Sequence, residues 1–504
     1  MHDTTRKIVD GKDTTVNAPR TARRHRPRSQ PLAWRQTFTD RRRRRRLATD
    51  PLKRAPKGLA SFWTRGRRLL WSWWPWALVC FVLVETREWW WALGAGAMGL
   101  ISYLIAPVEA APQYGLDHEF AADSTEFMTT MAGATGLPFT EGNRIDLLNN
   151  GDEFYPVMLR EIALAASSIT IEAYIYWEGE IGRTFANALA DRARAGVTVK
   201  ILLDAVGSSS IGNDILDILE SSGCQIAWYN PIHWYTIGRF NNRTHRKSLI
   251  LDGRVGFTGG AGIADHWLGH AQDEDHWRDM NLRIEGPAVV PLQTGFAQNW
   301  LERTGELVSG SLYYPPVAPA GPHVALTIIS SPVTGASNVR IMYYLSIICA
   351  RRTLFIANPY FVPDAAAIET LIEAKERGVD VKVMVAGSNN DNWLARQNSI
   401  RLYGRLLRAG IEIYEYNRTM LHHKTMVVDG VWATIGTTNF DNRSFAHNEE
   451  SNVCFYDAAL VQKLEQTFRD DLHACARVDV GAWKNRGVLA RLQEFLAAFL
   501  QEQV

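Results

Sequence analysis

The eight residues His245–Asp252 read HRKSLILD, and the eight residues His422–Asp429 read HHKTMVVD. Both fit the pattern H-x-K-x4-D. By chance, three fixed residues at this spacing occur in roughly a few chains per hundred of this length, so one copy is a weak signal. Two copies at matching positions of an internal repeat are a specific signal. Two imidazoles suit a site in which one histidine attacks a phosphodiester and the other protonates the leaving group.

The repeat extends well beyond the two motifs. Residues 194–201 (RAGVTVKI) parallel residues 376–383 (ERGVDVKV), and residues 279–282 (DMNL) parallel residues 450–453 (ESNV). Each half predicts an amphipathic helix, a short apolar strand, a helix that ends at glycine, and another strand. This order is typical of α/β layered folds. We therefore expect two α/β units that pack as a pseudo-dimer.

Two helices in this pattern have predictable ends. Helices over residues 183–195 and 364–377 are each followed at once by a glycine, Gly196 or Gly378. Glycine is the residue that most often terminates a helix, because it adopts the left-handed backbone conformation without strain.

The predicted strands place the motif side chains on common faces. Because side chains alternate along a strand, His245 and Lys247 are expected to project together, as are His422 and Lys424. If the halves face each other across a pseudo-twofold axis, both pairs reach one pocket. The lysine ammonium groups are then placed to bind non-bridging phosphate oxygens and to stabilise a pentacoordinate transition state.

These motifs resemble those of the phospholipase D superfamily, and most closely those of bacterial cardiolipin synthases. The similarity covers residues 146–480. After the second motif, Gly436–Asn439 resembles the G-S/T-x-N segment of the family, and Phe440–Phe445 continues as cardiolipin synthases do. The first half departs from the pattern, because Gly260 and Gly262 stand where Ser and Asn are usual. Backbone N–H groups remain as phosphate donors there.

The resemblance implies roles for the motif residues. His245 becomes the nucleophile that forms a phosphohistidine, and His422 becomes the acid for the leaving alcohol and later the base for the acceptor. The order of these two roles stays open. Lys247 and Lys424 hold phosphate oxygens.

The supporting residues follow from the same comparison. Asp279 and Glu450, which are equivalent in the repeat, are expected to orient the histidines by accepting an N–H, as the carboxylate of a catalytic triad does. Asn439 is expected to contact phosphate, and the two motif aspartates are expected to fix local structure more than to touch substrate. The predicted site comprises His245, Lys247, Asp252, His422, Lys424 and Asp429, supported by Asp279, Asn439 and Glu450.

The implied activity is that of a membrane-bound phosphatidyltransferase that converts two phosphatidylglycerols to cardiolipin and glycerol, with no metal ion and no cofactor. A phospholipase D that transfers the phosphatidyl group to water is the alternative, since both reactions use the same residues. A nuclease is a third hypothesis. Two motifs in one chain, together with apolar segments that could span a membrane, argue against it. No nucleic-acid partner is therefore expected. The acceptor, the donor headgroup and the oligomeric state stay open.

The N-terminal region is strongly basic. Residues 1–68 hold 21 Lys/Arg and 5 Asp/Glu, although the whole chain has a net charge of only +2. Few apolar residues interrupt this charge, so the segment is expected to be disordered. Beside a membrane, it is expected to attract anionic lipid headgroups.

Two uncharged apolar stretches follow the tail, at residues 69–84 and 89–108. Tryptophans near their ends and arginines before the first stretch match interfacial belts and the positive-inside rule. The second stretch is long enough to span a bilayer, whereas the first is short and needs snorkelling arginines or bilayer thinning. We favour a two-span hairpin over one span. A hairpin leaves the catalytic part on the cytoplasmic side of the bacterial inner membrane, where five scattered cysteines suit a reducing compartment.

The expected organisation has five parts. These are a basic disordered tail (1–68), a transmembrane helical hairpin (69–108), a juxtamembrane connector (109–145), a first phospholipase D-like repeat (146–325) and a second (326–504).

Two further features carry weaker signals. His266, His270 and His276 suggest a metal site because His266 and His270 are spaced i, i+4. No HExxH motif or cysteine partner accompanies them, so a polar loop is expected. The loop over residues 231–244 is aromatic and basic. It is read either as an ordinary surface loop or as a contact for lipid or acceptor.

Overall fold

The computed structural model describes residues 73–104, 115–116, 118–231, 242–331 and 337–498. The predicted basic tail and most of the aromatic loop, residues 232–241, lie outside this part of the chain.

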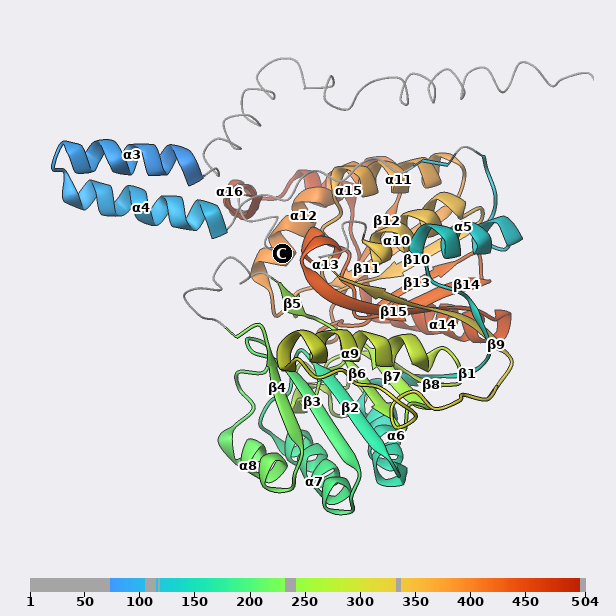
Figure 1. The fold of residues 1–504 in the computed structure, drawn as a ribbon. Coiled ribbons are helices and arrows are strands. Elements are labelled where there is room, and N and C mark those ends of the chain that lie inside the picture. Colours follow the sequence, from blue (N-terminus) through green and yellow to red (C-terminus); the bar gives the residue numbers. More distant parts are fainter. Residues whose placement is uncertain (1–72, 105–114, 117, 232–241, 332–336, 499–504) are drawn as a thin grey trace, which may run out of the picture. The chain divides into compact units, whose positions relative to one another are not determined.

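The first repeat is built on three parallel strands joined by two helices (Figure 1). Three antiparallel strands extend the sheet from β2, and one helix precedes and another follows these elements. The strands are β2 (Ser168–Ala173), β3 (Thr198–Asp204), β4 (Gln225–Tyr229), β6 (Ser248–Leu251), β7 (Val255–Gly259) and β8 (Met280–Glu285). The helices are α6 (Asn150–Leu164), α7 (Glu180–Arg194), α8 (Asn213–Ser221) and α9 (Val289–Thr304).

The second repeat has the same plan, again with three parallel strands extended by three antiparallel ones. Its strands are β10 (Thr353–Ala357), β11 (Asp380–Ala386), β12 (Glu412–Tyr416), β13 (Lys424–Val428), β14 (Trp432–Gly436) and β15 (Asn448–Tyr456). Its helices are α10 (Asn338–Cys349), α11 (Ala365–Glu376), α12 (Trp393–Arg408) and α14 (Ala458–Asp471).

Two strands join the repeats into one sheet. β1 (Thr140–Asn149) pairs with β8, β9 (His323–Ser330) pairs with β15, and β1 and β9 pair with each other. The strand order is β16-β12-β11-β10-β13-β14-β15-β9-β1-β8-β7-β6-β2-β3-β4, where β16 is Cys475–Arg477. Each half of this order mirrors the other about β9 and β1. The predicted pseudo-twofold arrangement is therefore present in the sheet itself.

Helices cover both faces of the sheet in each repeat. In β3, Ile201 and Leu203 belong to the core formed with α6, α7 and α8, whereas Leu202 packs with residues of α9. In β11, Val383 packs with α10, α11 and α12, whereas Met384 shares a core with Phe468 of α14. That last core also contains residues of β1 and β8, so it joins the two repeats.

The two helix ends predicted from glycine are confirmed. α7 ends at Arg194 and α11 at Glu376, and Gly196 and Gly378 both have a φ of 94°. Only glycine adopts this conformation without strain. Both helices begin within three residues of the predicted start.

The segment expected as a connector is largely structured. α5 (Thr125–Thr135) buries Phe127 and Met131 in the core of the second repeat, and the hydroxyl of Tyr456 donates to the carbonyl of Ala122. The boundary expected at residue 146 falls inside β1. The chain therefore enters the fold through the second repeat before it builds the first.

The two apolar stretches form helices where they are described. α3 (Trp73–Glu85) and α4 (Trp89–Leu104) are joined by a three-residue turn, and several of their apolar side chains are exposed, including Trp90 and Phe81. The outer ends of both stretches, residues 69–72 and 105–108, lie outside the described residues. Among the residues that are described, we find no helix with both the length and the apolar character required to cross a bilayer.

Candidate active site

The two motif histidines lie just before strands and not within them. His245 follows the short strand β5 (Arg243–Thr244) and precedes β6, and His422 precedes β13. The expectation that both histidines sit in regular strands is therefore wrong. Their backbone N–H groups instead bond across to the other repeat, from His245 to the carbonyl of Glu449 at 2.9 Å and from His422 to the carbonyl of Arg278 at 2.8 Å.

A carboxylate from the opposite repeat holds each imidazole. Both carboxylate oxygens of Glu450 lie 3.1 Å from Nδ1 of His245, and Oδ2 of Asp279 lies 2.7 Å from Nδ1 of His422. Nδ1 therefore carries the hydrogen and donates it to the carboxylate, which leaves Nε2 of each ring unprotonated. Sequence equivalence identified these two carboxylates, but it did not show that each serves the histidine of the other repeat.

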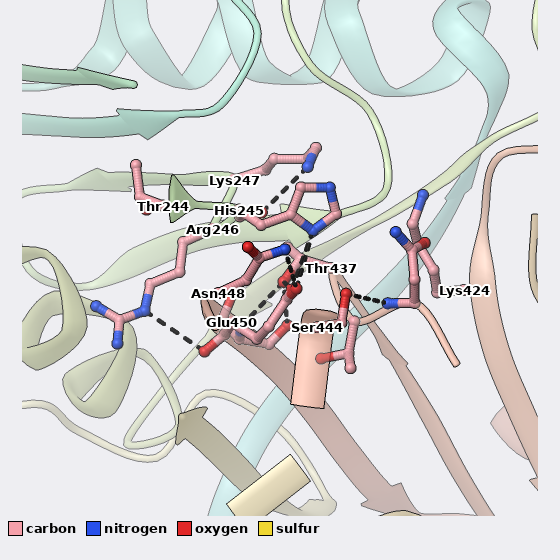
Figure 2. A network of polar contacts seen from close by, with 12 residues as sticks. Thr244, His245, Arg246, Lys247, Lys424, Thr437, Ser444, Asn448 and Glu450 are labelled. Carbon is pink, nitrogen blue, oxygen red and sulfur yellow. Dashed lines mark hydrogen bonds and ion pairs between the residues drawn. The ribbon is translucent and has the colours of Figure 1, made fainter. Parts of the chain in front are cut away.

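The two carboxylates are held by different partners. Glu450 accepts from the hydroxyl of Thr437 at 2.5 Å and from the amide of Asn448 at 3.4 Å (Figure 2). Asp279 accepts from the indole N–H of Trp267 at 2.8 Å and from the backbone N–H of Met280 at 2.7 Å. Two adjustable side chains thus support one histidine, while a rigid indole and a backbone group support the other.

The unusual Gly260 follows from the position of Asp279. A Cβ atom at residue 260 would lie 2.1 Å from Oδ1 of Asp279, and a Cβ at Gly262 would lie 2.9 Å from Ile175. Thr437 occupies the position equivalent to Gly260 and bonds to the longer Glu450. The side chain of Asp279 is shorter than that of Glu450, so its carboxylate lies closer to the backbone of residue 260. The first repeat therefore has no room for the family's Ser at this position.

Both motif lysines are buried beside their histidines. Lys247 donates to the carbonyl of His245 at 3.1 Å and lies 5.4 Å above the ring of Tyr174. Lys424 donates to the carbonyl of His422, and its Nζ lies 3.1 Å from Nε2 of that ring. Burial, reinforced by the charge of Lys424, lowers the pKa of Lys247 to about 7. Burial lowers the pKa of Lys424 to about 8.

The imidazoles are weak bases in this setting. Burial lowers the pKa of His245 to about 4 and that of His422 to about 3, and the adjacent lysines act in the same direction. Glu450 and Asp279 oppose this effect. Both rings are therefore neutral near pH 7, which is the nucleophilic form. A phosphodiester adds negative charge beside them, raises these pKa values and favours a proton on the ring that acts as acid.

The motif aspartates are tied to the backbone. Asp252 accepts from the N–H groups of residues 166, 167 and 168 at 2.7–2.9 Å. Asp429 accepts from the N–H groups of residues 351, 352 and 353 at the same distances. Each aspartate closes the turn that leads into the first parallel strand of its repeat, and neither lines the pocket that contains the histidines.

One pocket of about 270 Å³ joins the two halves of the site and is lined by both histidines, Lys247 and Asn439. Oδ1 of Asn439 is buried there and has no hydrogen-bond partner among the described residues. Several further lining residues were not predicted from the sequence. These are Tyr174, Ile175, Trp277, Tyr360, Asp391, Asn392, Asp441, Arg443, Ser444 and Asn448, together with Arg243, which belongs to the aromatic and basic loop over residues 231–244.

The repeat itself contained a signal for some of these residues. Asn448 and Trp277 stand two positions before Glu450 and Asp279, respectively, and all four lie in or beside the site. A residue-by-residue alignment of the two halves would therefore have predicted Asn448 and Trp277 as site residues.

The remaining histidines have other surroundings. His266 packs against Trp267 and Trp277, with ring centroids 4.2 and 3.9 Å away. His423 is buried with its Nε2 3.5 Å from Asp471 and does not line the pocket. No cluster of three potential metal ligands occurs among the described residues.

Comparisons with known proteins agree with the geometry. A family model described as "Cardiolipin synthase, PLD-like domain" matches residues 158–300 and 346–472. The chain is 34% identical over 366 residues to a cardiolipin synthase of Geobacillus kaustophilus, covering 72% of this chain and 73% of that protein. It is 32% identical over 369 residues to a cardiolipin synthase of Listeria innocua, covering 72% and 76%. A phosphatidylserine synthase structure from Haemophilus influenzae shares the fold, with a TM-score of 0.59 and 14% identity over 75% of this chain and 100% of that one.

Proposed function

Since this chain belongs to the cardiolipin synthase family of phospholipase D-like proteins, we propose that it transfers a phosphatidyl group between two phosphatidylglycerols, making cardiolipin and glycerol. The observation that carries the proposal is the crossed pair of histidine–carboxylate contacts at one pocket. Two neutral imidazoles held by their Nδ1 atoms, with two lysines beside them, meet the needs of a double displacement at phosphorus.

In the first step, Nε2 of His245 attacks the donor phosphorus. The bond between phosphorus and the glycerol oxygen breaks, and that oxygen takes a proton from His422. The products are a phosphohistidine and free glycerol. Glu450 stabilises the positive charge that develops on His245, because it accepts the Nδ1 hydrogen of that ring.

In the second step, a hydroxyl of the acceptor lipid gives its proton to His422 and attacks the phosphorus. The bond between phosphorus and nitrogen breaks, so His245 is restored and cardiolipin is released. Lys247 and Lys424 neutralise the non-bridging oxygens in both transition states. Asn439 lies at the same pocket and supplies a further polar contact to the phosphoryl group.

Membrane attachment is the second part of the proposal. Residues 69–108 form a transmembrane helical hairpin that holds the enzyme at the bacterial inner membrane with the catalytic part in the cytoplasm, and residues 1–68 bind anionic headgroups. The exposed apolar side chains of α3 and α4 support this assignment, as do the 21 basic residues of the tail. The two repeats, residues 146–325 and 326–504, form the catalytic unit.

A product assay tests the activity. Purified protein in detergent–lipid micelles receives labelled phosphatidylglycerol, and the His245→Ala and His422→Ala variants serve as blanks. We expect cardiolipin and glycerol from the wild-type protein and neither from the variants. Phosphatidic acid as the sole product would identify water as the acceptor and a lipase in place of a transferase. Full activity in either variant would refute the two-histidine mechanism.

A further inference from the structure

The catalytic residues of the site are symmetric between the repeats, whereas the other residues that line the pocket are not. Each repeat contributes one histidine, one lysine and one carboxylate. The two histidines and two lysines suffice for one phosphoryl group, which both halves of the reaction share. A second substrate has no counterpart in the other half of the site. Pocket residues that differ between the two repeats are therefore the candidates to bind it.

Part of the pocket lining, here called the polar wall, consists of Asp441, Arg443, Asn448 and Arg243, and it comes largely from the segment after the second motif. Asp441 caps α13 (Asn442–Ala446) by accepting from the N–H of Ser444 at 2.7 Å, and Arg443 and Asn448 line the pocket beside it. Arg243 completes the wall and forms a buried ion pair with Asp204 at 3.5 Å.

The equivalent positions of the other half are apolar or aromatic. Aligning Gly259 with Gly436 places His266 opposite Arg443 and Ala264 opposite Asp441. Aligning the two carboxylates places Trp277 opposite Asn448. Trp277 packs on His422 with ring centroids 5.2 Å apart. Met420, the equivalent of Arg243, is buried in the core that joins the repeats.

The two arginines act on the same part of the pocket. Burial raises the pKa of the Tyr174 hydroxyl, and Asp204 adds to this effect, whereas Arg443 and Arg243 oppose it. Tyr174 in turn packs on His245, with ring centroids 5.2 Å apart. Tyr174, Arg243 and Arg443 line the same pocket as His245.

Two carboxyl groups that line the pocket have raised pKa values. Burial raises the pKa of Asp441 to about 7, and Glu450 adds to this effect. Burial also raises the pKa of Asp391, which accepts from the hydroxyl of Tyr360 at 2.5 Å. Burial therefore disfavours the charged form of both carboxyl groups.

We infer that Arg443 and Arg243 bind the phosphodiester of the acceptor lipid, which makes the polar wall a subsite for an anionic phospholipid. The inference rests on the proposed function and specifies its second substrate. A guanidinium group donates two parallel N–H bonds to phosphate oxygens, a geometry that ammonium groups do not offer. A water acceptor needs no second cationic site.

Asn448 provides an independent sign of a ligand. Its amide N–H donates to Glu450 at 3.4 Å. Its Oδ1 is buried at the pocket and has no hydrogen-bond partner among the described residues. A buried carbonyl oxygen without a donor is costly. A hydroxyl of the acceptor's glycerol headgroup supplies that donor, whereas a phosphate oxygen does not.

A competition between two acceptors tests the subsite. Micelles of phosphatidylglycerol also receive ethanol, so one phosphohistidine intermediate partitions between cardiolipin and phosphatidylethanol. The ratio of the products depends only on the second step, and it is independent of the amount of folded enzyme. Arg443→Gln is expected to lower the ratio of cardiolipin to phosphatidylethanol by about tenfold, equivalent to about 1.4 kcal/mol. Arg443→Lys, which keeps the charge, is expected to lie between this variant and the wild type.

The control is Arg405→Gln, which removes an exposed arginine of α12 that pairs with Glu369 and lies outside the pocket. Its product ratio is expected to match that of the wild type. A ratio in Arg443→Gln equal to that of the control, whatever the total rate, would overturn the acceptor subsite and leave the proposed function standing. Phosphatidylethanol without any cardiolipin from the wild type would overturn both.

Discussion

The two carboxylates that hold the histidines are equivalent in the repeat, but the structure predicts that removing their charges has unequal costs. We consider Asp279→Asn and Glu450→Gln, which replace one carboxylate oxygen by an amide nitrogen and change the size of the side chain little. Each variant removes a charged acceptor from an imidazole N–H. Hydrogen bonds to charged groups contribute about 1.5–3 kcal/mol. We therefore expect kcat to fall by about 10- to 100-fold in both variants.

The stability of the two variants should differ. Oδ1 of Asp279 accepts from the backbone N–H of Met280, and Oδ2 accepts from both Trp267 and His422. An asparagine has one carbonyl oxygen, so its amide N–H₂ must face at least one of these donors. The least costly orientation keeps two bonds and leaves the Met280 N–H unpaired, at a cost of about 1–3 kcal/mol.

Glu450 has partners that can adjust. The hydroxyl of Thr437 also lies 3.3 Å from the carbonyl of Ser451, so it can donate there while accepting from the new amide. Glu450→Gln therefore avoids an unpaired backbone group. We expect Asp279→Asn to have an unfolding free energy lower than that of Glu450→Gln by about 1–3 kcal/mol.

Urea unfolding followed by tryptophan fluorescence gives this difference, and initial rates of labelled cardiolipin formation give kcat. Equal unfolding free energies in the two variants would refute the argument from fixed and adjustable donors. A kcat within threefold of the wild type in either variant would refute the role of the carboxylates in orienting the histidines.

Three further predictions concern other parts of the molecule. Because the pKa of Lys247 is lowered to about 7, its cationic form is lost as pH rises, so kcat/KM for phosphatidylglycerol should fall as pH rises through about 7; a rise over that range would contradict the assignment. Asp429→Ala leaves three backbone N–H groups without their acceptor. It should lower the unfolding free energy, measured by urea titration, by about 3 kcal/mol or more. A loss below about 1 kcal/mol would show that the turn does not depend on Asp429. Deletion of residues 1–68 should weaken co-sedimentation of the protein with phosphatidylglycerol vesicles at low salt. Co-sedimentation with neutral phosphatidylcholine vesicles should be unchanged. Equal binding to both lipids before and after the deletion would exclude attraction to anionic headgroups.

The sequence was informative where local pattern and repetition coincide. The helix ends at Gly196 and Gly378 were predictable because glycine at that position has one common structural use. The mirrored strand order followed from the repeat. The strand assignment of His245 was wrong because the regular pairing of β6 begins only at Ser248, whereas the N–H of His245 bonds to Glu449 in the other repeat. No local pattern encodes such a contact.

The pocket residues beyond the motifs were less accessible to sequence reasoning. Arg443 and Asn448 stand in a segment that the resemblance covered, yet their position at the pocket depends on how α13 and β15 pack. The requirement for glycine at residue 260 depends on the distance from its backbone to the carboxylate of Asp279. Only tertiary coordinates give that distance.

The exchange of carboxylates between repeats has a consequence for synthesis of the chain. A ribosome that has completed residues 1–330 has released a full first motif, but Glu450, which orients His245, has not yet been made. Reciprocally, His422 depends on Asp279 from the part already made. A nascent or truncated chain therefore carries no competent nucleophile, and phosphoryl chemistry begins only when the last strands have docked. Assembly of the protein and acquisition of reactivity are a single event.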